Sequence, residues 1–271
     1  MSHIALQRVI VRMMFDSHFR NSIYQNSAIA RDTADLSAEE CSWLTESDPR
    51  SYSADPHFCA RSLHSLLTEF PVTGAIALRS GGELERFFSS RVLHRAIQDG
   101  TSLVLAFGRW IAKEQRIRKA ECKASNQVEL GMAKLRRPQA AIQDHPISLA
   151  PHVSTISVFG GTLALYQQLL SQLAGKNTDL ATAALDPKFR LTLPLLEAGT
   201  EHLLIERKTD GQMAMEKLPD GLAAMLSLAE RGCTLNELLD CALATGAEGN
   251  EAQEIVDELY SDGLLADTRK P

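Results

Sequence analysis

Residues 201–218 read EHLLIERKTDGQMAMEKL and carry the clearest hairpin signal in the chain. The runs LLIER (203–207) and MAMEK (213–217) flank Thr209-Asp210-Gly211. An Asp-Gly pair between two such runs is a strong turn signal. We therefore predict an antiparallel ribbon over residues 202–217. A lone ribbon is barely stable in water, so it must pack against neighbouring elements.

The segments around this ribbon predict the rest of a small α+β module. Upstream, VSTISVFG (153–160) alternates and is rich in β-branched residues, which indicates a strand. Downstream, a first helix is expected in PDGLAAMLSLAERG, and a second begins at the Thr234–Glu237 capping box. A third helix is expected from Asn250 to near Gly263, and GLLA can form a short final strand. A hairpin beside three helices indicates a winged-helix-like topology.

The first half of the chain predicts helices. Ser37 and Glu40 form a capping box at the start of one of them. Asp55-Pro56 suits the start of another, because aspartate caps helices well and proline fits the first helical position. On that second helix, Leu66 and Phe70 share one stripe with Cys59 and Leu63. The opposite side carries His57, Arg61 and His64.

The stretch KLRRPQAAIQDHPISLAP (134–151) has three prolines and little periodicity, so we predict the domain linker near 137–151. The predicted organisation is a helical domain over 1–137 and a domain of a strand, a hairpin and three helices over 152–271. The fold class is α+β and mostly helical. The C-terminal domain is expected to be a winged-helix-like, peptide-recognition-element-like module with a small antiparallel sheet.

Charge and cysteine content narrow the function. The net charge is −6, but Lys113–Arg137 holds eight basic residues against three Glu, whereas Asp220–Asp267 holds eleven acids and one base. The five cysteines are scattered without a CxxC pair, so neither a disulfide framework nor a zinc site is expected. No apolar run reaches the roughly 18 residues that span a bilayer, and the N-terminus lacks signal-peptide features, so we expect no membrane association and a cytoplasmic location.

No catalytic constellation is evident, so we predict no catalytic residue and no metal ligand in this chain. The sequence lacks the GxGxxG, Walker A, GxSxG and HExxH motifs. His57, Arg61 and His64 suit the binding of a protein surface or an anionic group better than metal binding, since no carboxylate joins them at ligand spacing. A stand-alone enzyme that uses these three residues is the weaker hypothesis.

Winged-helix modules bind either DNA or peptides. Here the last helix would bring Glu251, Glu254, Asp257 and Glu258 against phosphates, so we expect no nucleic-acid binding. A winged-helix transcription regulator with a helical sensor domain is the alternative hypothesis, and the acidic last helix counts against it. An exposed sheet edge can instead accept a peptide as an extra strand. The residues predicted to bind such a peptide are Leu203, Leu204, Ile205, Glu206, Glu237, Asp240 and Glu254.

The N-terminal half resembles a known family. LQRVIVRMMFD (6–16) and LSAEECSWLTESDPRSYSADPHFCARSLHSLLTEFPVT (36–73) are similar to the MbnC family of methanobactin biosynthesis. The second half is similar to the C-terminal parts of such partner proteins.

The resemblance implies a non-catalytic subunit of a heterodimer with an MbnB-like TIM-barrel iron oxidase. The complex would convert cysteines of an MbnA-like ribosomal precursor into oxazolone–thioamide groups, giving a copper chelator. Iron and chemistry would belong to the barrel, with no cofactor in this chain, and the precursor would be held through its basic leader. The residues predicted to contact the oxidase are Asp48, Arg50, His57, Arg61 and His64.

Overall fold

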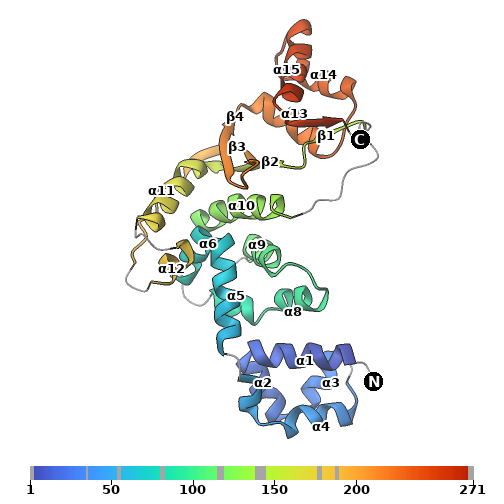
Figure 1. Ribbon diagram of the computed structural model, residues 1–271, viewed down its shortest axis with the longest axis vertical. Helices are drawn as coiled ribbons and strands as arrows, with labels where there is room; N and C mark the ends of the chain where they lie inside the picture. Colours follow the sequence, from blue (N-terminus) through green and yellow to red (C-terminus); the bar gives the residue numbers. More distant parts are fainter. Residues whose placement is uncertain are drawn as a thin grey trace. The chain divides into compact units, whose positions relative to one another are not determined.

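The computed structural model describes residues 3–34, 36–53, 56–79, 83–114, 119–137, 145–175, 179–186 and 189–267. The fold is mostly helical α+β, with 64% helix, 14% strand and small antiparallel sheets mostly in the C-terminal part, as predicted. Two compact units form: Met1–Ile117 with Leu173–Arg190, and Arg118–Gln172 with Leu191–Pro271 (Figure 1). No helix of the described residues is long and apolar enough to cross a membrane.

The first unit is helical. Its elements are α1 (His3–Phe15), α2 (Ser17–Gln25), α3 (Ala28–Ala34), α4 (Ala38–Glu46), the 3-10 helix η1 (Pro49–Ser53), α5 (Pro56–Glu69), α6 (Pro71–Leu78), α7 (Glu83–Phe88), α8 (Arg91–Gln98), α9 (Leu103–Lys113) and α12 (Leu180–Leu185).

Local signals place α4 and α5 as expected. At the start of α4, the Glu40 amide donates to Ser37 Oγ at 3.2 Å, and the Ser37 amide donates to Glu40 Oε2 at 2.8 Å, which confirms the predicted capping box. On α5, Leu66 is buried while Arg61 and His64 are exposed, as the helical period predicted, and Phe70, directly after the helix, is also buried. Asp55, the predicted N-cap, and the side chain of Cys59 lie outside the described part of the chain.

The second unit holds the sheets. Its elements are α10 (Ala120–Leu135), β1 (Ile147–Leu149), β2 (Val153–Gly160), most of α11 (Thr162–Ala174), β3 (Glu197–Arg207), β4 (Met213–Leu218), α13 (Asp220–Glu230), α14 (Leu235–Ala244), α15 (Gly249–Ser261) and β5 (Leu265–Asp267).

The predicted hairpin forms as β3 and β4, in a three-stranded antiparallel sheet of order β2-β3-β4. At the turn, the Gly211 amide donates to the Lys208 carbonyl at 2.9 Å and the Lys208 amide donates to the Gln212 carbonyl at 2.8 Å. Gly211 has a φ of +83°, a conformation that glycine adopts without steric cost. The Asp-Gly pair therefore does lie in the turn, whose three residues, Thr209–Gly211, are enclosed by the hydrogen-bonded pair Lys208 and Gln212.

Both faces of this sheet are covered within the second unit. On one face α10 approaches closely, because a Cβ added at Gly131 would lie 2.7 Å from Cδ1 of Ile205. On the other face Leu204 and Leu218 belong to a hydrophobic core shared with α13, α14 and α15. Figure 1 shows α10 and α13 on opposite sides of the strands. The central strand β3 is thus buried from both sides.

A second, two-stranded sheet pairs β1 with β5, and Ile147 also bridges Cys233. The predicted short final strand is confirmed as β5. The strand β1 lies inside the predicted linker. It was not predicted, because Pro146 and Pro151 on either side of it indicated a loop. Residues 138–144 of that linker lie outside the described residues.

The compact units differ from the predicted domains. Helix α10, placed in the N-terminal domain from sequence, packs on β2 and β3 and belongs to the second unit. Residues 173–190 belong to the first unit, where α12 packs on α5 and α6. Packing between elements, of α10 on the sheet and of α12 on two helices, sets these memberships, and order along the chain does not.

Candidate functional site

The predicted partner-binding face on α5 forms a shallow hollow. Arg61 and His64 line it together with Ser65, Thr68 and Glu69, around a volume of about 380 Å³. His64 Nε2 lies 3.7 Å from Asp179 Oδ1 at the start of α12. Hydrogen bonds from Thr182, above all from its side chain, lower the pKa of Asp179. His64 of the hollow therefore lies next to a carboxylate that stays ionised. The side chain of His57 lies outside the described part of the chain.

Asp48 and Arg50 belong to a different hollow. They line a volume of about 630 Å³ with residues of α2, α4 and the following turn. Asp48 Oδ1 accepts a hydrogen bond of 2.7 Å from the Arg50 amide, which holds the turn that leads into η1. Both side chains are exposed. The structure thus divides the described members of the predicted partner-binding set between two surfaces of the first unit.

No three His, Cys, Asp or Glu side chains come together as a metal site among the described residues. The acids of α15 predicted to repel DNA, Glu251, Glu254, Asp257 and Glu258, are all exposed. These carboxylates are therefore accessible and could repel the phosphates of DNA, as the expectation of no nucleic-acid binding requires.

The prediction that Leu203–Glu206 offers a free edge is wrong. Leu203, Leu204 and Ile205 are 0%, 2% and 0% exposed, and Glu206 is half-buried. All four lie in β3, which pairs with β2 on one side and β4 on the other. The hairpin signal identified the ribbon but not its third strand, and β2 covers the side that was expected to be open.

The open edge is β4. In an antiparallel pair, residues alternate between directing their backbone groups to the partner strand and directing them away from it. Lys208 donates to Gln212 at 2.8 Å, and Arg207 donates to His152 at 2.8 Å. Even-numbered residues of β3 therefore bond β4 and odd-numbered ones bond β2. By the register, the backbone groups of Met213, Met215 and Lys217 then point away from β3.

This outer side of β4 is unpaired by any strand in the described residues. The other edge strand, β2, is covered in part, because Gln127 Nε2 of α10 donates to the Ser157 carbonyl at 3.4 Å. Met213 and Met215 are half-buried, and Glu216 and Lys217 are exposed. An extended peptide could therefore pair with β4 without displacing an element of the sheet.

The three acids predicted to attract a peptide have different roles. Glu237 caps α14: its Oε2 accepts from the Thr234 amide at 2.7 Å and from Thr234 Oγ1 at 2.9 Å. These bonds lower the pKa of Glu237, so it remains an anion. Asp240 and Glu254 are exposed on α14 and α15.

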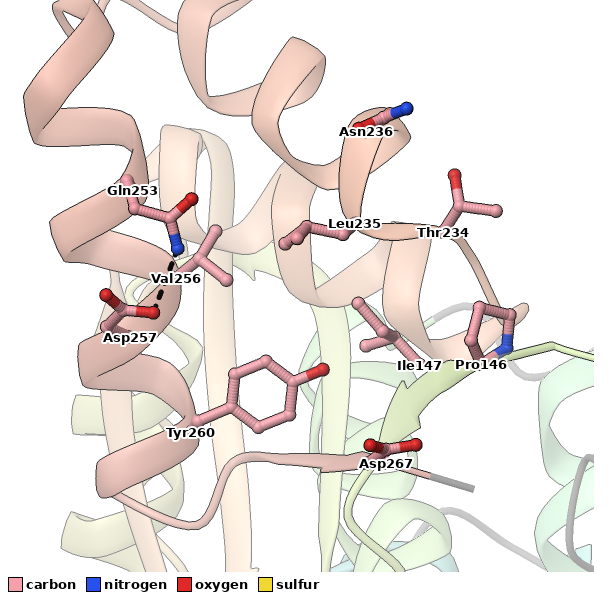
Figure 2. A pocket seen from close by; sticks show the side chains of 10 residues that line it. All are labelled: Pro146, Ile147, Thr234, Leu235, Asn236, Gln253, Val256, Asp257, Tyr260 and Asp267. Carbon is pink, nitrogen blue, oxygen red and sulfur yellow. Dashed lines mark hydrogen bonds between the residues drawn. The ribbon is translucent and has the colours of Figure 1, made fainter. Parts of the chain in front are cut away.

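A pocket that the sequence did not predict opens in the second unit (Figure 2). Its volume is about 450 Å³, and it lies between the start of α14, the second half of α15, and the β1–β5 pair. The lining residues are Pro146, Ile147, Thr234, Leu235, Asn236, Gln253, Val256, Asp257, Tyr260 and Asp267. One sequence signal was available: leucines 235, 239 and 243 recur every fourth residue on α14, and 235 and 243 remain exposed.

Burial raises the pKa of Tyr260, and the neighbouring Asp267 and Cys233 raise it further. The phenol therefore stays protonated near neutral pH and can both donate and accept a hydrogen bond. Figure 2 shows its hydroxyl directed toward the middle of the pocket.

Comparison with known proteins adds no assignment: no family model matches the chain, and a search of the curated proteins finds no match.

Proposed function

We propose that this chain is the non-catalytic subunit of an iron-dependent, peptide-modifying oxidase. Its second unit would bind the leader of a ribosomal precursor peptide, whose cysteines the complex converts to oxazolone–thioamide groups. The observation that carries the proposal is the outer edge of β4, with which no strand of the described residues pairs, in a sheet whose two faces are covered by helices.

Strand addition suits this edge physically. Main-chain hydrogen bonds to Met213, Met215 and Lys217 would provide affinity for an extended segment of nearly any sequence. Specificity must then come from side chains and charge. The eleven acids between Asp220 and Asp267, against the single base Arg231, favour a basic peptide and speed its association. A basic leader is what the resemblance to the MbnC family implies.

The first unit would bind the oxidase. The hollow at Arg61 and His64 and the one at Asp48 and Arg50 offer exposed charged groups. In this proposal the MbnB-like partner holds the iron and performs the oxidation, and this chain binds and orients the precursor. A barrel oxidase and a short cysteine-containing peptide encoded next to this chain would support the assignment.

The alternative, a winged-helix transcription regulator, draws on the three helices α13–α15 and the strands beside them. The exposed acids of α15 oppose it, because they would meet the phosphates of DNA with like charge.

The leader site can be tested with Met215→Pro. Because the Met215 amide points away from β3, proline removes a group that only an added strand would use. We expect the folded variant, in complex with the oxidase, to bind a fluorescent leader of an MbnA-like precursor at least tenfold more weakly. Fluorescence anisotropy measures this affinity.

The matched control is Met215→Ala, which trims the side chain but keeps the amide. It should bind the leader within about threefold of wild type. Wild-type affinity of a folded Met215→Pro variant would show that the leader does not pair with β4.

The oxidase interface can be tested with Arg61→Glu. If Arg61 meets a carboxylate of the partner away from water, charge reversal weakens assembly by on the order of 2 kcal/mol. Co-purification of the two subunits should then fall. Arg31→Glu, at an exposed arginine of α3 outside the predicted face, should leave co-purification intact. Equal recovery of both variants would place the interface elsewhere.

A further inference from the structure

The pocket between α14, α15 and the β1–β5 pair combines an apolar floor with an acidic rim. Ile147 and Val256 are buried side chains at its base, and Leu235 remains 41% exposed on its wall. Figure 2 shows Asp257 and Asp267 on the α15 and β5 sides, with the Tyr260 ring between them. Among the residues that the structure describes, no Lys, Arg or His lines the pocket.

The rim charges are held in place. Gln253 Nε2 donates to Asp257 Oδ1 at 2.9 Å, and both residues lie on the same face of α15. Asp267 is fixed by the register of β5, where it lies opposite Ile147. The two carboxylates thus stand on regular secondary-structure elements around a hollow. In a solvated acidic surface, by contrast, no hollow would lie between the charged groups.

The space is small for a cofactor. Ligand pockets of small molecules typically span about 300–1,000 Å³ and enclose their ligand, and this one is open and near the lower end of that range. It can admit one or two amino-acid side chains. A long side chain with an apolar stem and a cationic end fits its chemistry: the stem would lie on Leu235 and Val256, and the charge would meet Asp257 and Asp267. The electron-rich face of the Tyr260 ring adds attraction for a cation.

We propose that this pocket binds the lysine or arginine side chain of a peptide. Charge complementarity selects this occupant over an acidic or purely apolar one. None of the described lining residues would neutralise an anion, and an uncharged side chain would desolvate the carboxylates without compensating their charge. The exposed Leu243, two turns beyond Leu235 on α14, offers apolar contact for a neighbouring residue of the same peptide.

The inference deepens the proposed function, on which it rests for the peptide nature of the ligand. Strand addition at β4 recognises backbone, whereas this pocket recognises one side chain. The two sites would therefore supply affinity and specificity separately, and each can be tested without the other.

The test uses the full chain, labelled with ¹⁵N and titrated with Ac-Leu-Lys-Leu-NH₂. We expect amide shifts concentrated at residues 234–236, 253–260 and 265–267. The analogue Ac-Leu-Nle-Leu-NH₂, in which norleucine keeps the aliphatic stem but lacks the ammonium, should bind at least fivefold more weakly. The lysine peptide should likewise bind the variant Asp257→Asn/Asp267→Asn at least fivefold more weakly than it binds the wild type. Asparagine keeps an oxygen that can accept from Gln253, so the fold should be retained.

The matched control is Glu258→Gln/Asp262→Asn, which removes the same charge from exposed positions at the C-terminal end of α15, outside the pocket lining. It should change affinity for the lysine peptide less than twofold. Equal weakening by both double variants would show non-specific attraction to the acidic unit and overturn the pocket proposal, as would undiminished binding of the norleucine peptide. Neither result would bear on the Met215→Pro measurement, so failure of this inference is distinguishable from failure of the proposed function.

Discussion

Ile205→Pro should unfold the second unit. Ile205 is 0% exposed in the central strand β3, and by the alternation of the ladder its amide bonds to β2. Proline removes that donor, leaves a buried acceptor on β2 unsatisfied, and takes away a side chain that packs against Gly131 of α10. Together these losses amount to on the order of 5 kcal/mol. Whole domains are commonly stable by only about 5–15 kcal/mol.

Hydrogen exchange measured by mass spectrometry can show this result. Protection of the segments covering β2, β3 and α10 should be lost in the variant. Both tryptophans, Trp43 and Trp110, lie in the first unit, so tryptophan fluorescence during urea unfolding monitors that unit separately. Met215→Pro is the position-matched control, since residue 215 pairs with Ile205 but directs its amide outward. Retained protection in the Ile205→Pro variant would contradict the central placement of β3.

The first unit should lose stability as the pH falls from about 6.5 to 4. His94 of α8 is 7% exposed, and its Nε2 is buried without a hydrogen-bond partner. Burial, and then the charge of Arg12, lower the pKa of His94 from 6.5 to about 4, although Asp16 opposes the change. Since the imidazole takes up its proton more readily when unfolded, acid favours the unfolded state.

The sign and the range of this effect follow from the two pKa values. Above about pH 6.5 the ring is neutral in both the folded and the unfolded state, so its titration does not change the free energy of unfolding. Between 6.5 and 4 the unfolded state binds the proton first, and stability falls by about 3 kcal/mol in total. Below pH 4 the ring is protonated in both states and the loss stays constant.

Urea unfolding followed by tryptophan fluorescence at pH 7, 5.5 and 4.5 measures this loss. His94→Leu fills a similar volume and cannot titrate, so its stability should fall less steeply over this range than that of wild type. His18→Gln, at an exposed histidine of α2, should keep the wild-type slope because water reaches that ring in the folded protein. A wild-type slope in His94→Leu would show that other groups cause the acid sensitivity.

Sequence alone determined the features that depend on neighbouring residues. The Asp-Gly pair set the turn at 209–211 because few residues other than glycine accept the positive φ of Gly211. The capping boxes at Ser37 and Thr234 marked helix starts because their bonds span only three residues. The helical period placed Arg61 and His64 outward on α5 because burial repeats with each turn.

Tertiary structure decided which edges and surfaces stay open. Whether β3 lies at an edge depends on β2, a strand some forty residues earlier, and no local pattern encodes that pairing. Because β2 pairs with β3, the open edge of the sheet is β4. Helix α10 belongs to the second unit because it packs closely on the sheet at Gly131. The pocket joins Ile147, Leu235, Asp257 and Asp267 from four separate elements. Its existence depends on long-range packing, which leaves no periodic signal along the chain.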